Sequence, residues 1–323
     1  MPRDSSQDSH LWDRERPLWE LAQESREQSM LSLDCPNANG LIHSLMMSNP
    51  CVKGALFGPP DRVTLTLKKT DVWERRVHEV MPDGHRRLDA KPVGQVTFLA
   101  ETFVGAAQPE ATVHHDSGEV TLTLERDGTR CDLRWLIAMS RQNVMAIQAT
   151  SSQGLAGMGL RLYRHLDDHG LPKPTSGRDG RHFWIHQAIS AGKTFPDGFE
   201  YYLVGRVAEG NAGIETIEDA SGLAVPIAYH TAGDRHSLLT SNEQVLVSNE
   251  NHAPGAAATA RFIPGNDATV FLTIVTNNEA AAPLSEAKRR LDAAVARGYA
   301  ALKEANRQWY RELYERREQG RIF

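Results

Sequence analysis

Two strands and the turn between them can be read in the stretch Asn49-Pro-Cys-Val-Lys-Gly-Ala-Leu-Phe-Gly-Pro-Pro-Asp-Arg-Val-Thr-Leu-Thr-Leu-Lys-Lys-Thr-Asp-Val-Trp73. Polar and apolar residues alternate over residues 63–67, and this alternation is typical of a strand with one buried face. Gly58-Pro-Pro-Asp61 supplies turn residues, because proline fixes φ and glycine tolerates a positive φ. The stretch therefore predicts two strands joined by a tight turn.

Similar runs recur along most of the chain and predict about eleven strands. Turn clusters such as Asp116-Ser-Gly118 and Arg126-Asp-Gly128 separate them at spacings suited to antiparallel hairpins rather than to βαβ crossovers. We expect a mainly β fold, a large antiparallel two-sheet sandwich or supersandwich. Residues 155–170 are interpreted as room for a short helix, although their glycines disfavour one. The predicted strands cover residues 63–67, 95–99, 119–124, 131–137, 144–148, 181–186, 200–205, 223–229, 243–247, 257–262 and 268–275.

The pattern changes after Pro283, where apolar residues recur at intervals of three and four. This period predicts an amphipathic helix or helix pair over residues 281–323, with a break at Gly298. The chain is thus divided into an N-terminal arm over 1–35, a β-sandwich domain over 36–280 and this C-terminal helical linker. The recurring apolar residues are Leu284, Ala287, Leu291, Val295, Tyr299, Leu302, Ala305, Trp309 and Leu313.

The amino-acid composition indicates which broad classes of protein this chain can belong to. Hydrophobic residues make up 40%, charged residues 24%, and the formal net charge is −5, which indicates a globular chain rather than a disordered one. Lys and Arg are mixed with acidic residues along the chain, so no nucleic-acid partner is expected. No stretch approaches the roughly 20 apolar residues of a membrane-spanning helix, and the charged start lacks a signal-peptide core. We therefore expect no membrane partner and a cytoplasmic location.

Candidate metal and catalytic sites are sparse. His182 and His186 lie four residues apart in a strand-like run without a nearby carboxylate, while His165 and His169 flank two aspartates at helical spacing. Ordinary surface histidines explain both pairs better than a metal site does. The chain has no Gly-x-Ser-x-Gly nucleophile motif, and no Walker loop follows Gly58. We expect no metal, no cofactor and no catalytic residue of these classes.

The opening stretch resembles the N-terminal β-sandwich of glycoside hydrolases of the family 95 type, the α-L-fucosidase-like enzymes. In those proteins a strand of small residues with a Phe-Gly corner leads to a polar strand that ends in Asp-x-Trp. The helical segment Asn306-Arg-Gln-Trp-Tyr-Arg-Glu-Leu-Tyr314 looks like the aromatic linker helix that follows such a sandwich. The chain has Ser48-Asn-Pro-Cys51 where that family usually has Gly-Asn-Gly. The matching residues of the first stretch are Gly54, Phe57, Gly58, Arg62, Leu65, Leu67, Asp71 and Trp73.

The resemblance implies a specific role for this chain. The catalytic acids of the resembled enzymes lie in an (α/α)6 barrel, so no catalytic residue is carried over. The implied function is that of a non-catalytic sandwich portion of a glycoside hydrolase, with the barrel, or a separate chain, docking on the C-terminal helix. Asp71 and Trp73 would line the sugar site, because an indole stacks on a sugar face while a carboxylate accepts hydroxyl protons. The other interpretation is structural, with Trp73 packed between sheet and helix and Asp71 capping a turn.

Two other functions stay open. One is a free-standing carbohydrate-binding or interaction sandwich, whose platform would come from an aromatic group over residues 183–202. Alternation along each strand sends about half of these rings into the core. The other is a small sandwich-fold lyase or epimerase, which would need His182, His186 or His230 to converge with a Tyr or Glu. The aromatic group consists of Phe183, Trp184, Phe195, Phe199, Tyr201 and Tyr202.

Overall fold

The computed structural model of the 323-residue chain describes most of the residues between 17 and 320. The described ranges are 17–30, 41–42, 44–74, 89–166, 171–191, 196–209, 212–220, 227–230, 245–248 and 254–320. The fold, the contacts and the sites below concern these residues.

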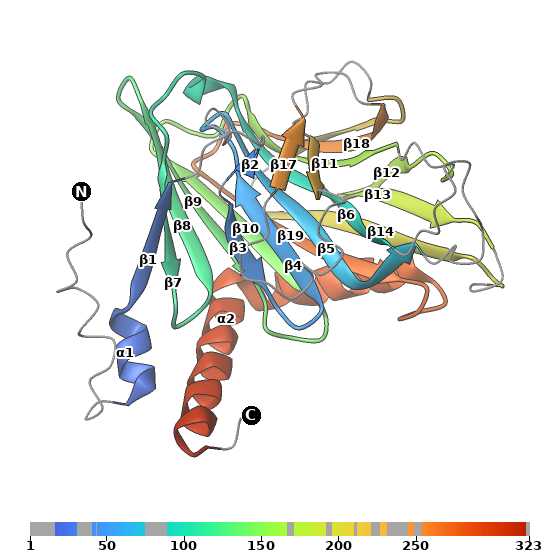
Figure 1. The fold of residues 1–323 in the computed structure, drawn as a ribbon. Helices are drawn as coiled ribbons and strands as arrows, with labels where there is room; N and C mark the ends of the chain where they lie inside the picture. The colour runs from blue at the N-terminus through green and yellow to red at the C-terminus, as the bar shows by residue number, and fades with distance from the viewer. Residues whose placement is uncertain are drawn as a thin grey trace.

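Two antiparallel sheets make up the body of the described structure (Figure 1). The first has nine strands in the order β1-β7-β8-β9-β10-β19-β14-β13-β12, and the second has seven in the order β15-β18-β11-β6-β5-β4-β3. A small sheet orders β16 (Ile227–His230), β17 (Val245–Ser248) and β2 (Leu41–Ile42). The nine-stranded sheet contains β1 (Arg26–Met30), β7 (Glu110–His114), β8 (Glu119–Arg126), β9 (Thr129–Ile137), β10 (Val144–Ser151), β12 (Thr175–Asp179), β13 (His182–Ile189), β14 (Phe199–Glu209) and β19 (Asp267–Thr276). The seven-stranded sheet contains β3 (Leu45–Ser48), β4 (Val52–Phe57), β5 (Arg62–Glu74), β6 (Asp89–Ala100), β11 (Met158–His165), β15 (Ala212–Ile217) and β18 (Gly255–Phe262).

The main core fills the space between the two large sheets. Alternate residues of each strand point into it, as the period of two requires. Leu65 and Phe98 enter it from the seven-stranded sheet, and Trp135 and Leu272 enter it from the nine-stranded sheet. The opening pair of strands is β4 and β5, which are antiparallel neighbours as predicted. The prediction of a mainly β two-sheet sandwich is therefore confirmed.

The interpretation of residues 155–170 as a short helix is wrong. Residues Met158–His165 form β11, which lies between β6 and β18 in the seven-stranded sheet. Leu160 and Leu162 alternate into the core, and Gly159 allows the neighbouring backbone to approach closely, since a Cβ there would lie 2.6 Å from the Ala260 carbonyl oxygen. The glycines thus belong to a close-packed strand rather than to a helix.

Most other predicted strands fall on strands of the structure. Of the predicted strand over 223–229, residues 223–226 lie outside the described residues, as do 243 and 244 of the next one. Several strands had no strong alternation and were not predicted, namely β1, β3, β7, β12 and β15.

Two α-helices complete the described fold, with one short 3-10 turn, Glu101–Phe103. Helix α1 (Leu18–Glu24) lies in the predicted N-terminal arm, and the following β1 pairs with β7 at the edge of the nine-stranded sheet. Helix α2 (Pro283–Glu318) bends at Gly298, whose φ of 78° and ψ of 165° are non-helical. The predicted break at Gly298 is therefore confirmed, while the division into arm, sandwich and linker stays a prediction. In the described part of the chain, neither helix is long and apolar enough to cross a membrane.

Helix α2 runs beneath the nine-stranded sheet and then turns down toward α1 (Figure 1). Its first part covers the outer face of that sheet, where Ala287, Leu291 and Ala294 form a second hydrophobic cluster with side chains such as Val204 and Phe271. The fold thus has a sheet, a core, a second sheet and a helix in layers. The end of the sandwich near the start of α2 carries a network of charged and polar side chains.

Candidate functional site

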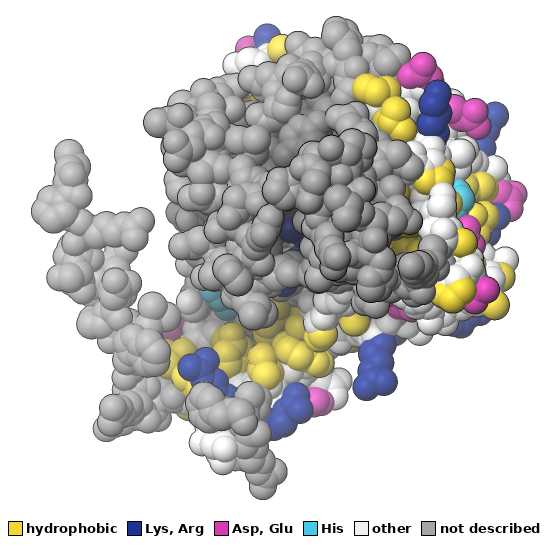
Figure 2. Space-filling model, turned by 45° about the vertical axis from the view of Figure 1, so that its right-hand side comes forward, with side chains coloured by type: hydrophobic (Ala, Val, Ile, Leu, Met, Phe, Trp, Pro, Cys, Tyr) yellow, Lys and Arg dark blue, Asp and Glu magenta, His cyan; other side chains and the backbone are white. Residues whose placement is uncertain are grey.

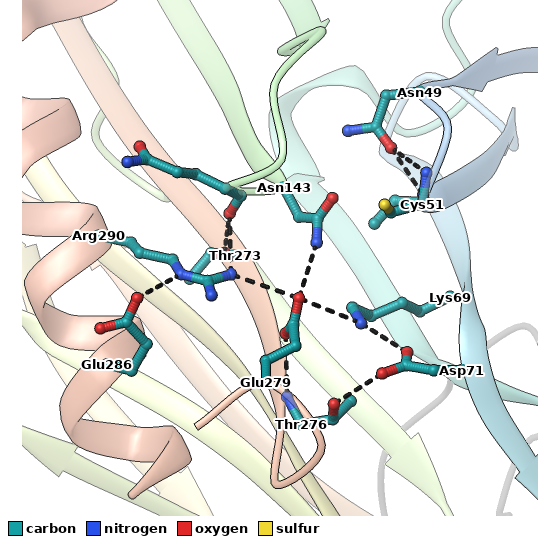
Figure 3. A network of polar contacts seen from close by, with 12 residues as sticks. Asn49, Cys51, Lys69, Asp71, Asn143, Thr273, Thr276, Glu279, Glu286 and Arg290 are labelled. Carbon is teal, nitrogen blue, oxygen red and sulfur yellow. Dashed lines mark hydrogen bonds and ion pairs between the residues drawn. The ribbon is translucent and has the colours of Figure 1, made fainter. Parts of the chain in front are cut away.

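Several turns and strand ends meet where α2 begins (Figure 3). The C-terminal part of β5 brings Lys69 and Asp71, and the chain after β19 brings Glu279. Helix α2 adds Glu286 and Arg290 from its first two turns. Segments more than 200 residues apart in sequence thus contribute charged side chains to one place.

Lys69 is the centre of this network. Its side chain is only 3% exposed, and its Nζ lies 2.5 Å from Asp71 Oδ1 and 3.5 Å from Glu279 Oε1. Lys69 and Asp71 lie two residues apart on β5, and such residues share one face of a strand. A buried ammonium needs charged or hydrogen-bonding partners, because its desolvation is costly. The two carboxylates supply that compensation.

Asp71 also joins the two sheets. Its Oδ2 accepts a hydrogen bond of 2.7 Å from Thr276 Oγ1, so β5 of one sheet is tied to β19 of the other. Thr276 in turn donates its backbone N–H to Glu279 Oε2 at 3.3 Å. Both carboxylate oxygens of Asp71 therefore have partners, although 27% of the side chain remains exposed.

Glu279 extends the network to the helix. Its Oε1 lies 3.7 Å from Arg290 Nη1, and Asn143 Nδ2 donates to the same oxygen at 3.4 Å. Arg290 is nearly buried and donates from Nε to Glu286 Oε1 at 2.8 Å. Hydrogen bonds from Arg289 and Arg290 lower the pKa of Glu286 to about 2.

The resulting arrangement is a chain of alternating charges. It runs from Asp71 through Lys69, Glu279 and Arg290 to Glu286, and it fastens the first turns of α2 to both sheets. No group in it is positioned against a second catalytic group in the way a nucleophile and base would be. Chemically, the exposed edge of Asp71 can still accept a hydrogen bond from a hydroxyl group, because each carboxylate oxygen has two lone pairs.

The two residues proposed to line a sugar site have different outcomes. The structure places Asp71 in the charged network, and it places Trp73 on β5 with Ala90 as its backbone partner in register. The side chain of Trp73 lies outside the described residues. The substrate-binding role of both residues therefore stays a prediction.

Sequence reasoning missed the partners of Asp71. Lys69 had a local signal, since it precedes Asp71 by two residues on the same strand face. No local sequence signal pointed to the other members of the network, Thr276, Glu279 and Arg290. Only the packing of the two sheets and α2 brings them near β5.

His182 and His186 do not share a metal site in the described structure. His182 Nε2 lies 2.9 Å from Asp292 Oδ1, whereas His186 Nε2 lies 2.9 Å from Glu200 Oε2. Each histidine thus has its own carboxylate partner. His165 is the C-terminal residue of β11, and His169 lies outside the described residues, as does the side chain of His230. The described residues contain no group of three or more His, Cys, Asp or Glu side chains placed to hold a metal ion.

The aromatic group divides as strand alternation predicts. Phe183, Phe199 and Tyr201 are buried in the main core. Trp184 and Tyr202 face outward and are half-buried at the rim of the cluster under α2. Phe195 lies outside the described residues.

Both outward rings already have intramolecular partners. Lys288 Nζ lies 4.9 Å above the ring of Trp184, and His186 stacks on Tyr202 with ring centroids 4.3 Å apart. Trp184 also lies against Gly177, where a Cβ would come within 2.5 Å of the indole. The Lys288 contact fits a role in fastening the edge of the sheet to α2, whereas the other contacts lie within the sheet.

Comparison with known proteins gives a distant structural likeness. No family model and no curated protein sequence matches the chain. Among solved structures, a putative kojibiose phosphorylase from human microbiome matches 84% of this chain and 39% of its own, at 11% identity and a TM-score of 0.40. A bacterial glucoamylase complexed with acarbose matches 90% of this chain and 40% of its own length, at 10% identity and a TM-score of 0.44. A family GH92 α-mannosidase from Bacteroides thetaiotaomicron, in complex with mannoimidazole, matches 90% of this chain and 33% of its own length, at 12% identity and a TM-score of 0.29.

This chain spans about two fifths or less of the length of these proteins. The three matches are carbohydrate-active glycoside hydrolases and phosphorylases by description, and membership of family 95 is not shown by them.

Proposed function

We propose that this chain is the non-catalytic β-sandwich portion of a carbohydrate-active glycoside hydrolase. In this role α2 is the linker helix, and an (α/α)6 barrel, as a further domain or a separate chain, docks on its C-terminal end. The motifs of β4 and β5 and of the aromatic helix support the proposal. So does their arrangement, because both occur in a large sandwich that carries a helix on one outer face.

The end of α2 carries the proposal. A self-contained module would bury the aromatic side chains of this helix, whereas a linker leaves them partly open to a partner. Trp309, Tyr310, Leu313 and Tyr314 are all half-buried. Trp309 and Tyr310 form an edge-to-face pair with centroids 5.1 Å apart. Figure 2 shows a group of hydrophobic side chains in the lower part of this view, beside Lys and Arg side chains.

Asp71 and Trp73 are proposed to contribute to the wall of the sugar site. The carboxylate of Asp71 is held in place by Lys69 and Thr276 and is partly exposed. A fixed acceptor of this kind loses little conformational entropy when a sugar hydroxyl binds.

The first test is the coding sequence that follows the codon for Phe323 or lies in an adjacent gene. An open frame that encodes paired amphipathic helices with acidic loops supports the proposal. A stop codon with no such neighbour contradicts it.

The second test uses the assembled enzyme. Asp71→Asn should raise KM for the glycoside while leaving kcat within about twofold, because a binding contact outside the acid pair is lost. Asp132→Asn, which alters an exposed carboxylate on β9, is the matched control and should leave KM unchanged. A loss of stability in Asp71→Asn without a change in KM would show that Asp71 has a structural role only.

The alternative function, a stand-alone carbohydrate-binding sandwich, has weaker support. Its platform would consist of Trp184 and Tyr202, and both rings are already covered on one side by Lys288 and His186. A glycan array probed with this chain tests it directly. Binding that is lost in Trp184→Ala but kept in Asp71→Asn would favour the alternative.

A further inference from the structure

The outer face of the seven-stranded sheet carries a row of polar residues. Leu160 and Leu162 of β11 point into the core, so Arg161 between them points to the opposite face. The strand register places Arg161 beside Thr97 of β6 on one side and Thr259 of β18 on the other. Both threonines are almost fully buried.

Arg161 lacks a partner in the described structure. Its Nε atom is buried and makes no hydrogen bond, and no described carboxylate lies within ion-pair distance of its guanidinium. A buried guanidinium nitrogen without an acceptor is costly, so an unsatisfied group of this kind calls for an explanation. Burial lowers the pKa of Arg161, and the charge of Arg261 lowers it further, while the charges of Glu215 and Glu101 act in the opposite direction.

Two more arginines lie close to Arg161. Arg261 lies on β18, two residues after Thr259, and is paired in register with Gly159 of β11. Its side chain is 37% exposed. Its nearest carboxylates, Glu101 and Glu215, are both 3.9 Å away and largely exposed, so these pairs are weak.

Arg62 of β5 completes the group on the other side. It lies in register with Leu99 of β6, and its side chain is 38% exposed while it pairs with Asp61 at 3.0 Å. The charge of Arg62 also acts on Arg161. On the far side of Arg261, Gly213 has no side chain, and a Cβ there would meet nothing within 4 Å. The guanidinium groups of Arg261 and Arg62 are therefore approachable from solvent.

We propose that Arg161, with Arg261 and Arg62, binds a small oxyanion on this outer face. The ligand class is a phosphate-type or carboxylate group. A guanidinium presents a planar fork of N–H donors that matches two oxygens of such a group, and the bond is charge-assisted. An oxyanion would supply the acceptor that Arg161 lacks and would offset the repulsion among three like charges.

The experiment measures binding of sodium phosphate and, separately, of sodium glucuronate by calorimetry, with sodium chloride at equal ionic strength as the reference. The same solutions are used in thermal unfolding of the full chain. Binding should raise Tm with a saturating dependence on concentration. Arg161→Met should weaken binding at least about tenfold, because one charge-assisted contact is worth about that much.

Matched variants make the result specific. Arg261→Met should weaken binding by a smaller factor, and Arg141→Met, at an exposed arginine in the turn between β9 and β10, should leave it unchanged. In the absence of an oxyanion, Arg161→Met should be as stable as the wild type or more so, because an unpartnered charge is removed.

Each outcome decides the proposal. Binding of phosphate alone, or of glucuronate alone, identifies which oxyanion class the site takes. Absence of binding by both, or binding that Arg161→Met leaves intact, overturns the proposal. A large loss of stability in Arg161→Met without added anions would also overturn it, since Arg161 would then have a structural partner.

Discussion

The two parts of α2 are held to the sandwich in different ways. Residues 283–297 lie on the nine-stranded sheet through small and aliphatic side chains, with Ala287 and Leu291 fully buried. Residues 299–318 contact the hairpin of β7 and β8 mainly through polar groups. The two parts of α2 share one helical periodicity in sequence but make different kinds of contact with the sandwich.

The polar contacts of the second part are specific and partly buried. Glu119 of β8 has only 2% of its side chain exposed and accepts from Tyr299 Oη at 2.8 Å and from Lys303 Nζ at 2.5 Å. Burial and the nearby Glu119 charge raise the pKa of Tyr299, so its hydroxyl keeps its proton as a donor. Arg307 pairs with Asp116 at 3.0 Å.

Asn306 binds three backbone groups. Its Nδ2 donates to the carbonyls of Ser117 and Ile137, each at 2.9 Å, and its Oδ1 accepts from the Met139 N–H at 2.8 Å. Directional bonds of this kind fix the orientation of the second part, whereas the first part combines apolar burial with the ion pairs of Arg290 at its start. The two parts of one helix thus differ in which contact dominates, buried apolar area in the first and directed hydrogen bonds in the second.

The largest expected effect is in the apolar part. Leu291→Ala should lower the free energy of unfolding by about 3 kcal/mol, because it empties a fully buried site. Leu313→Ala, at a half-buried position of the second part, should cost less than about 1.5 kcal/mol. Urea denaturation of both variants measures the difference. Equal costs would remove the contrast between the two parts.

The polar part should respond to loss of a single amide. Asn306→Ala removes the side-chain partner of three backbone groups, two of them in buried bonds, and should cost about 2 kcal/mol. Hydrogen exchange should show the loss of protection mainly in residues 299–318. Gln308→Ala removes an exposed amide that bonds only within the helix and is the control. Uniform loss of protection over the whole of α2 would contradict the view that its two parts are held to the sandwich independently.

The junction itself can be stiffened. Gly298→Ala should cost about 1–2 kcal/mol, because φ of 78° with ψ of 165° is a region that non-glycine residues rarely adopt. A Cβ at this position meets no atom within 4 Å, so strain in the backbone is the cause rather than a clash. Gly213→Ala, which is also open in space and has no positive φ, should be nearly neutral when both are measured by denaturation. A neutral Gly298→Ala would show that the bend adapts freely.

The smallest effect concerns the charged start of α2. The pKa of Glu286 is lowered to about 2 from 4.5, so its contribution to stability is present above pH 4.5 and is lost as the pH falls toward 2. Glu286→Gln should flatten the fall of stability in that window by less than about 1 kcal/mol, since Arg289 is largely exposed. Denaturation midpoints at pH 2 to 6 measure this slope, with Glu315→Gln in the second part as control. An unchanged slope in Glu286→Gln would rule out this pair as a pH-dependent contact.

The sequence alone determined the fold class and the outline of α2. Period-two alternation over residues such as 63–67 and 119–124 predicted strands, and the three- and four-residue period after Pro283 predicted a helix or helix pair with a break at Gly298. These features depend on the spacing of residues within one element, which is local information. The short helix at 155–170 was wrong because β11, with its glycines, is specified by its neighbours β6 and β18.

Only the tertiary structure decided the sites. Asp71 could be selected from its place in β5, but its bond to Thr276 and its link through Lys69 to Glu279 depend on how two sheets and a helix meet. The contact of Asn306 with three backbone groups and the missing partner of Arg161 were equally invisible in sequence. Hydrogen bonds and ion pairs act over a few ångströms between residues far apart in the chain, so a pattern along one strand or helix carries no record of them.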